Sequence, residues 1–388
     1  MNPPAIRVTL VIITTLVAST LGASAAIATS QAATLSGSPG SVRTDQWHLT
    51  SLAADQALEV SQGSGVIVAI PDTGVYPHPD LVRNLLPGID IVSGGTGDGK
   101  GDQNSHGTGM AGLIAAHGQN NDQGARGIAP EAKILPVMSS TSDNRSSSDD
   151  LAKAIEYAIS SGADIINISS AGSSSPRLRS AIRAAISSNI LVVAAAGNRP
   201  TDSEVGYPAS EEGVLAVGGV DRRGNHAAIA VTGSEIDVVA PAVDIYSTSI
   251  NGKYRKGTGT SDATAIVAGA AALIRSKYPH LPAQEVAHRL TATAIDKGPP
   301  GRDDEYGYGV IDLVAALTAD VPPLGFESVS APAGGGASTT AAAQPGDDGP
   351  ATMRGLVTLG VIVAAGVAWV MVLRRRRRGD DPPPRISR

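Results

Sequence analysis

The chain has 388 residues, a formal net charge of −6 and no cysteine. Its length accommodates one large α/β domain with appended segments, and its acidic balance argues against nucleic acid as the main partner. Without cysteine, disulfides, thiolate metal sites and a cysteine nucleophile are all excluded.

The N-terminus has the pattern of a secretory signal peptide. Arg7 precedes an apolar run that ends near residue 28 in two A-x-A patterns, at residues 23–25 and 26–28. A basic start, an apolar middle and a small-residue cleavage site are the three parts of such a peptide. We therefore predict a signal peptide over residues 1–28, with an uncleaved anchor as the alternative, and a short extension over residues 29–45.

The first elements of the folded domain place two polar residues at the ends of regular structure. A helix is expected over residues 52–61, and the apolar run over residues 65–70 predicts a strand buried on both faces of a parallel sheet. Asp72 follows this strand, at the end where open α/β sheets place their ligands, although an ordinary turn is the alternative. A helix over residues 105–116 carries His106 in its first turn, either as a functional residue or as a surface or capping histidine.

Strands and helices continue to alternate as far as residue 317. Further strands are expected over residues 134–138, 163–169, 190–196, 214–220 and 237–240, and further helices over residues 148–160, 178–188, 283–294 and 310–317. Ser148 or Asp149 is expected to cap the first of these helices, and residues 246–249 and 254–256 to form a hairpin. The alternation predicts a parallel sheet wound by right-handed crossovers.

Ser261 begins the Ala-rich helix expected over residues 261–277 and has two interpretations. A serine at this position caps a helix by accepting a backbone N–H bond. It is also a candidate nucleophile, because backbone donors and the helix dipole stabilise a developing anion at a helix N-terminus. The segment alone leaves both interpretations open.

The C-terminal part has the pattern of a membrane anchor. Residues 319–354 are rich in Pro, Gly, Ala and Ser and are predicted to be a linker after a domain over residues 46–318. Residues 355–373 carry no charge, and five arginines follow them. The length of this stretch is close to the ~20 residues that a helix needs to cross a bilayer. Positive clusters remain on the cytoplasmic side, so residues 374–388 are predicted to be a cytoplasmic tail. A buried core helix is the alternative for the apolar stretch.

Asp72, His106 and Ser261 supply the residue types of a catalytic triad. A serine hydroxyl becomes a strong nucleophile only when a base takes its proton, and a carboxylate orients the histidine that serves as this base. Asn198 follows another strand and can donate a hydrogen bond to an oxyanion beside the Ser261 backbone N–H. In isolation, Asn198 is equally an ordinary turn asparagine.

The segments around these residues resemble the subtilisin-like serine proteases, or subtilases (peptidase family S8). The matching segments are V-A-I-P-D-T-G-V at 68–75, H-P-D-L at 78–81, H-G-T-G-M-A-G at 106–112, G-I-A-P at 127–130, I-I-N-I-S at 165–169, A-A-A-G-N at 194–198, G-T-S at 259–261 and Y-G-Y-G at 306–309. The resemblance covers about residues 46–317. It implies a subtilisin-like α/β fold with a parallel sheet flanked by helices, and serine endopeptidase activity on polypeptides.

The resemblance also implies roles for individual residues. Asp72, His106 and Ser261 become the catalytic triad, and Asn198 becomes the oxyanion donor. The segment Ser169, Ser170, Ala171 and Gly172 is expected to line the substrate cleft, where its backbone pairs with an extended peptide.

The two ends of the chain indicate one group within the subtilases. A signal peptide, a C-terminal anchor and an arginine tail together are similar to the mycosins, which are membrane-anchored subtilases associated with type VII secretion. This similarity implies a single-pass protein of the cell membrane, with the protease domain extracellular, the C-terminus cytoplasmic and the type VII secretion machinery as a possible partner.

Two features depart from the family pattern. Asp262 places a charge beside the nucleophile, and Ala265 replaces a proline. Asp262 is expected either to raise the pKa of His106 or to alter substrate access. It also favours a second function, that of a subtilase-fold structural subunit of a secretion complex with weak or absent proteolysis. The extension over residues 29–45 is too short to be the folded inhibitory propeptide of many subtilases.

Neither a metal site nor a cofactor is predicted. The remaining histidines show no metal-ligand spacing and are His48, His78, His117, His226, His280 and His288. Asp98, Asp102 and Asp122 lie in glycine-rich loops, where calcium is possible but unsupported. The glycines near residues 94–101 are not followed by the Lys-Ser/Thr pair of a phosphate-binding loop.

Overall fold

The computed structural model describes residues 25–26, 33–35, 39–92, 96–119, 123–141 and 145–325. The chain divides into two units, residues 1–328 and 329–388, and the second lies outside the described residues. The predicted anchor over residues 355–373, the predicted basic tail and nearly all of the predicted signal peptide also lie outside the described residues. These three assignments stay predictions. Within the described ranges, no helix is long and apolar enough to cross a bilayer.

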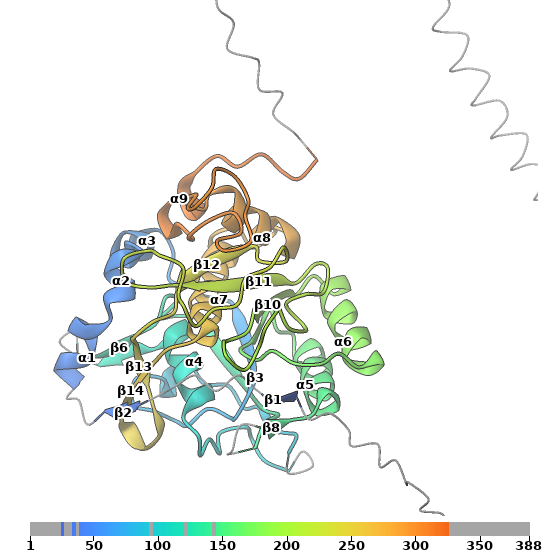
Figure 1. Cartoon of the computed structure of the whole chain (residues 1–388). Helices are drawn as coiled ribbons and strands as arrows, with labels where there is room; N and C mark the ends of the chain where they lie inside the picture. Colours follow the sequence, from blue (N-terminus) through green and yellow to red (C-terminus); the bar gives the residue numbers. More distant parts are fainter. Residues whose placement is uncertain are drawn as a thin grey trace, which may run out of the picture. The chain divides into compact units, whose positions relative to one another are not determined.

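A seven-stranded parallel sheet forms the centre of the first unit (Figure 1). From one edge to the other, its strands are β12 (Val238–Pro241), β11 (Leu215–Val220), β10 (Leu191–Ala195), β9 (Ile165–Ile168), β3 (Ile67–Asp72), β7 (Lys133–Met138) and β4 (Ile89–Asp90). The predicted parallel sheet is confirmed, and β4 adds a short edge strand that the sequence did not indicate.

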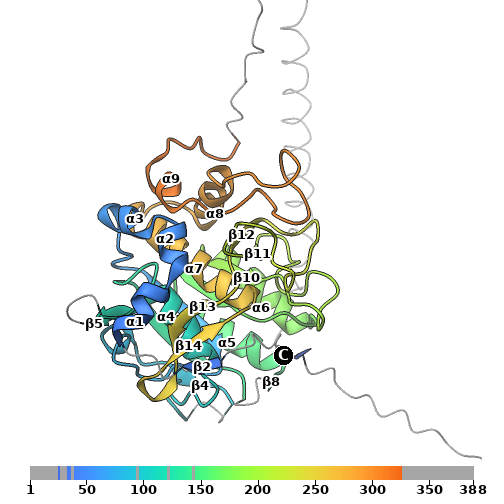
Figure 2. The ribbon, with the colours of Figure 1, turned by 60° about the vertical axis from the view of Figure 1, so that its left-hand side comes forward.

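Helices cover both faces of this sheet (Figure 2). One layer contains α4 (His106–Ala115) and α7 (Thr260–Lys277), and the other contains α5 (Ser148–Ser160) and α6 (Pro176–Ser187). On β3, Val68 and Ile70 belong to the core beneath the first layer and Ala69 to the core beneath the second. Side chains that alternate between two buried faces explain why the strands are continuous apolar runs rather than alternating ones.

The helices α4 and α7 are enclosed almost completely. Every residue of α4 is buried, and so is every residue of α7 from Thr260 to Arg275. A helix that is buried on all sides cannot be amphipathic, and small side chains let it approach its neighbours closely. The Ala- and Gly-rich composition of both helices therefore follows from their position between the sheet and the outer elements.

Shorter elements surround this core. They are α1 (Pro39–Asp45), α2 (Trp47–Ser51), α3 (Ala54–Val60), β5 (His117–Gln119), β6 (Gln123–Arg126), α8 (Ala283–Ala292) and α9 (Leu313–Thr318). The predicted hairpin is confirmed as β13 (Ile245–Thr248) and β14 (Tyr254–Gly257). Two short N-terminal strands extend other elements: β2 (Ala33–Leu35) pairs with β14, and β1 (Ala25–Ala26) pairs with β8 (Arg145–Ser146).

Two helices are capped by other residues than those considered from the sequence. Gly259, and not Ser261, is the N-cap of α7, so Ser261 lies inside the first helical turn. Ser147, and not Ser148 or Asp149, caps α5 by accepting a hydrogen bond from the Asp150 backbone N–H. The helix α7 therefore begins one residue before its predicted range, whereas α5 begins at residue 148 as predicted.

His48 is fully buried in the core and makes the stability of the protein depend on pH. Among the described residues, neither ring nitrogen has a hydrogen-bond partner, and burial lowers the pKa of His48 to about 3. An unfolded histidine titrates near ~6.5, so the unfolded state binds the proton first as the pH falls. The contribution of neutral His48 to the free energy of unfolding is therefore fully present above about pH 6.5 and is lost as the pH falls towards 3.

We therefore expect acid to destabilise the protein through His48. One proton corresponds to about 1.4 kcal/mol per pH unit, or about 2 kcal/mol between pH 6.5 and 5. Urea unfolding at these two pH values should show a smaller loss of unfolding free energy in His48→Leu than in the wild type. His280→Leu, at an exposed position, is the control. Equal losses in wild type and His48→Leu would contradict the assignment.

Candidate active site

Asp72 and His106 meet where β3 ends and α4 begins. The Nδ1 atom of His106 lies 2.8 Å from Oδ1 and 2.9 Å from Oδ2 of Asp72, and both side chains are buried. Oδ1 also accepts a hydrogen bond of 2.7 Å from the Thr73 backbone N–H. A Cβ atom on Gly107 would lie 3.1 Å from the Asp72 Cβ and would collide with the carbonyl oxygen of Gly74. The glycine after the histidine therefore permits the close approach of the two segments.

Asp102 holds these two segments together, a role that sequence reasoning missed. Its Oδ1 accepts bonds from the Asn104 and Ser105 backbone N–H groups and from the Thr73 hydroxyl. Its Oδ2 accepts bonds from the backbone N–H and hydroxyl of Thr108. Asp102 thus anchors the first turn of α4 and the residue after Asp72. The only available signal was an acidic residue shortly before a helix start.

Ser261 is the second residue of α7, and its side chain is buried. Its hydroxyl donates a hydrogen bond of 3.0 Å to the carbonyl oxygen of Ser169, and the Ser169 hydroxyl donates one of 3.3 Å to the Ser261 carbonyl oxygen. The Nε2 atom of His106 is buried and has no hydrogen-bond partner among the described residues. The imidazole is thus held at Nδ1 and has its second nitrogen available.

Asn198 lies beside the start of α7, and its orientation can be assigned. Its Oδ1 accepts a hydrogen bond of 2.9 Å from the Thr260 backbone N–H and one of 3.2 Å from the Thr260 hydroxyl. Because a backbone N–H can only donate, it identifies the oxygen of the carboxamide. The Nδ2 group is buried and has no partner in the described part of the chain. Asn198 therefore keeps a free donor next to Ser261.

We expect Asn198→Ala to lower kcat by about 10²–10³-fold with little change in KM, because an oxyanion donor acts mainly in the transition state. Steady-state hydrolysis of a peptide substrate measures both constants. Asn225→Ala, at an exposed position, is the control and should match the wild type. A kcat within twofold of the wild type would remove Asn198 from the mechanism.

The segment from Ser169 to Gly172 leaves β9 and borders a cavity. Gly172 pairs with Tyr207 through two backbone bonds of 2.9 and 3.0 Å. Gly172 and Tyr207 also line an open, polar cavity of about 760 Å³ together with the segment Thr201–Gly206. Burial, followed by the nearby Glu211 carboxylate, raises the pKa of Tyr207 to about 12, so this phenol is neutral at physiological pH. The last residue of the segment expected to bind substrate, Gly172, therefore lies at the wall of this cavity.

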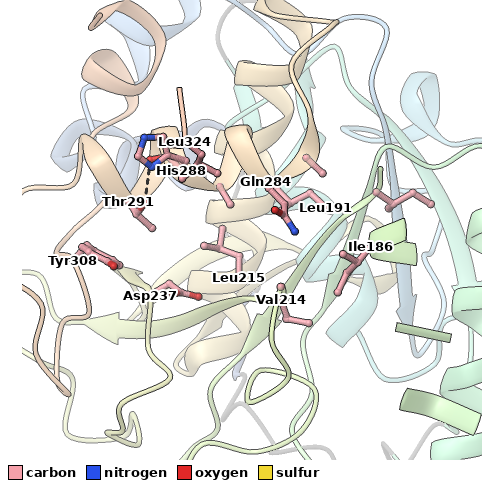
Figure 3. Close-up of a pocket in the computed structure, with 14 residues that line it drawn as sticks. Ile186, Leu191, Val214, Leu215, Asp237, Gln284, His288, Thr291, Tyr308 and Leu324 are labelled. Carbon is pink, nitrogen blue, oxygen red and sulfur yellow. Dashed lines mark hydrogen bonds between the residues drawn. The ribbon is translucent and has the colours of Figure 1, made fainter. Parts of the chain in front are cut away.

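A second cavity of about 280 Å³ is apolar and is not part of this site (Figure 3). It is lined by Leu191 and Leu215, the first residues of β10 and β11, and by residues of α6 and α8. In a parallel sheet the first residues of the strands lie at the edge opposite to the last, and Asp72 ends its strand. The apolar cavity and the Asp72–His106 pair therefore lie at opposite ends of the sheet.

Two of the three aspartates considered for calcium lie among the described residues. Asp98 is exposed and pairs with Lys100, and Asp102 is occupied by the donors named above. Asp122 lies outside the described residues. Within the described ranges, no group of three or more His, Asp and Glu side chains could hold a metal ion.

Asp262 lies in the protein interior and not at the mouth of the site. Its side chain is fully buried, and its Oδ1 lies 3.4 Å from Nη2 of Arg255, which is also buried. The expectation that Asp262 alters substrate access is therefore not supported. The alternative expectation, an effect on His106, remains.

Comparisons with known proteins show which family the chain resembles over most of the described domain. The profile of the subtilase family matches residues 63–309. Subtilisin DY of Bacillus licheniformis is 40% identical over 260 residues, which cover 66% of this chain and 92% of that protein. Subtilisin E of Bacillus subtilis (strain 168) is 42% identical over 259 residues, which cover 66% of each chain.

Two solved structures are also similar. The crystal structure of MycP1 with its N-terminal propeptide removed is 31% identical with a TM-score of 0.64, covering 71% of this chain and 98% of that one. The crystal structure of MycP1 from the ESX-1 type VII secretion system is 27% identical with a TM-score of 0.65, covering 77% of this chain and 90% of that one.

Proposed function

Because the chain belongs to the subtilase family and is a serine endopeptidase, we propose that Asp72, His106 and Ser261 are its catalytic triad. The observation that carries this proposal is the contact of 2.8 Å between His106 Nδ1 and Asp72, while the buried Nε2 atom has no hydrogen-bond partner in the part of the chain that the structure describes. A base that is fixed at one nitrogen and available at the other is what serine activation requires.

The proposed reaction follows from the available atoms. Rotation about the Cα–Cβ bond of Ser261 turns its hydroxyl from Ser169 towards His106. The Ser261 oxygen then attacks the peptide carbonyl carbon while Nε2 of His106 takes the hydroxyl proton, and Asp72 stabilises the imidazolium. His106 returns the proton to the leaving amine. Water then attacks the acyl-enzyme with His106 again acting as the base.

The proposed oxyanion site is formed by Asn198 and the start of α7. The free Nδ2 group of Asn198 and the Ser261 backbone N–H supply the donors, and the positive end of the α7 dipole supports them. No metal or cofactor takes part in this proposal, because its charges are all stabilised by side-chain and backbone groups.

The substrate is proposed to be an extended polypeptide that binds along the segment from Ser169 to Gly172. An extended peptide adds to such a segment as a strand, with backbone groups for affinity and the adjoining cavity for side chains. The carbonyl oxygen of Ser169 already accepts one hydrogen bond, from the Ser261 hydroxyl. The rotation that activates Ser261 also frees this oxygen.

We further propose that the enzyme is attached to the outer face of the cell membrane and is associated with type VII secretion. Support comes from the likeness to MycP1 of the ESX-1 type VII secretion system and from the apolar and arginine-rich C-terminal segments. In this arrangement residues 355–373 form the anchor and residues 374–388 the cytoplasmic tail, so the protease domain faces the secreted polypeptides.

One labelling experiment tests the proposal. A fluorophosphonate probe, which reacts with activated serines, is added to membrane and soluble fractions of cells that express the full chain. We expect a labelled protein in the membrane fraction, and no label in Ser261→Ala. Ser276→Ala, at the other end of the same helix α7, should be labelled like the wild type.

Each other outcome contradicts a part of the proposal. Equal labelling of wild type and Ser261→Ala would assign the reaction to another serine. Label in the soluble fraction alone would contradict the anchor. A folded wild type that is never labelled would favour the subtilase-fold structural subunit.

A further inference from the structure

A charged pair is enclosed between the helix of the base and the helix of the nucleophile. Asp262 directly follows Ser261 on α7, and Arg255 lies on β14, the strand that leads into this helix. Their atoms Oδ1 and Nη2 lie 3.4 Å apart, and the two side chains are 0% and 1% exposed. In the described part of the chain, neither Asp262 oxygen accepts a hydrogen bond. Removing charges from water is expensive, so a pair this deep calls for an explanation beyond stability.

Two glycines provide the space for this pair. A Cβ atom on Gly109 would collide with the guanidinium group of Arg255. A Cβ atom on Gly257 would collide with the same guanidinium and would lie 2.7 Å from Oδ2 and 2.8 Å from Oδ1 of Asp262. Gly109 is in the same helix as His106, one turn further along. The pair therefore contacts α4 directly. Gly109 of α4 and Gly257 of β14 leave the space that the two charged side chains fill.

Neighbouring hydroxyl groups fix the base helix against the hairpin that carries Arg255. Ser247 lies opposite Arg255 in the hairpin and donates a hydrogen bond of 2.7 Å to the carbonyl oxygen of Gly109. Thr248 donates one of 2.7 Å to the carbonyl oxygen of Thr108. The position of Arg255 relative to α4 is thus defined by the hairpin.

Few charged groups surround His106 in the described structure. Asp72 of β3 is bonded to it, Asp102 binds the first turn of α4, and Asp262 and Arg255 form the pair described above. Burial raises the pKa of Asp262, while Arg255 and His106 lower it, so the imidazole and this carboxylate interact.

The charged residues on the other elements packed on α4 have partners of their own, and Asp98 and Lys100, in the loop before α4, pair with each other. The strand β13 contributes the uncharged Ser247 and Thr248. Arg126 of β6 pairs with Asp55, and Lys133 of β7 binds the carbonyl oxygen of Arg83. Lys133 lies opposite Ile67, at the far end of β3 from Asp72. The pair of Asp262 and Arg255 is therefore a buried charged group that contacts the helix of His106 and interacts with it.

We propose that Arg255 and Asp262 are positioning residues that hold the nucleophile helix against the base helix and balance the charge that His106 experiences. This inference rests on the proposed triad. With both charges present the pair is neutral overall, so it neither favours nor opposes the imidazolium that forms during catalysis. The unusual residue beside the nucleophile is then a part of a working protease, and not a sign of lost activity.

The pH dependence of kcat/KM tests this assignment. Asp262→Asn removes the negative charge and leaves Arg255, which stays protonated, against Gly109, one turn along α4 from His106. The loss of one negative charge next to Arg255 disfavours the imidazolium, so the acid limb should move to lower pH by about 1 unit. In the double variant Arg255→Met/Asp262→Asn no buried charge of the pair remains, and the limb should return to within about 0.3 units of the wild type.

Controls separate this inference from a merely structural role. Glu156→Gln on α5 breaks an exposed ion pair with Arg177 of α6 and should leave the limb in place. If Asp262→Asn does not fold, Asp262→Ser replaces it with the same expected shift. An unshifted limb in the folded single variant, or an equal shift in the single and double variants, would overturn the proposal.

The same samples distinguish a failure of this proposal from a failure of the proposed function. Fluorophosphonate labelling of wild type but not of Ser261→Ala establishes the nucleophile independently of the pH profile. If wild type is labelled but its acid limb coincides with that of Asp262→Asn in the pH profile of kcat/KM, only the proposed role of the pair is overturned. An unlabelled wild type would overturn the triad and this inference with it.

Discussion

Replacement of Ser261 by alanine is expected to lower kcat for peptide hydrolysis by about 10⁶-fold, the order of magnitude found when the nucleophile of a subtilisin is removed. The change deletes the attacking oxygen, so the remaining groups cannot form an acyl-enzyme. The small side chain should leave the fold intact, because the Ser261 hydroxyl makes one hydrogen bond, to the Ser169 carbonyl oxygen. Active-site titration and steady-state hydrolysis of a peptide substrate measure the loss.

A matched control is available on the same helix. Ser276→Ala removes a hydroxyl that donates to the carbonyl oxygen of Ser64, far along α7 from the site. It should retain the wild-type kcat. If Ser261→Ala kept more than about a hundredth of the wild-type rate, another residue would have to be the nucleophile.

Replacement of Asp72 by asparagine is the second large expected effect, a fall in kcat of about 10⁴-fold. The carboxylate now accepts from Nδ1 of His106 at 2.8 Å, which leaves Nε2 free to accept the serine proton. An asparagine can donate its N–H to Nδ1, and the ring then carries its proton on Nε2, in the wrong tautomer for a base. The Thr73 backbone N–H can still donate to the asparagine oxygen, so the local structure is preserved.

The rate of Asp72→Asn should be measured beside that of Asp98→Asn. Asp98 is an exposed aspartate in the loop before α4, and its replacement removes the same charge at the surface. We expect its kcat to match the wild type. A loss of less than tenfold in Asp72→Asn would mean that Asp72 does not control the tautomer of His106.

Local patterns in the sequence determined the main elements and the candidate residues. Apolar runs such as those of β3 and β10 identified buried parallel strands, because side chains that alternate between two covered faces must be apolar on both. The spacing of such strands and helices then predicted the parallel sheet. The candidate residues at the ends of these elements were readable because their chemistry depends on residue type: a hydroxyl, an imidazole, a carboxylate and a carboxamide.

Only the tertiary structure decided which of these groups are neighbours. It placed Asp102 across the base helix and the Asp72 segment, and it moved the cap of α7 from Ser261 to Gly259. It also placed Arg255, a residue that the sequence analysis did not single out, in a buried contact with Asp262. Strand order, burial and partners depend on contacts between segments far apart in the chain, and local propensity carries no information about such contacts. The residue types were therefore available from the sequence, whereas the environment that sets their charges and orientations required the fold.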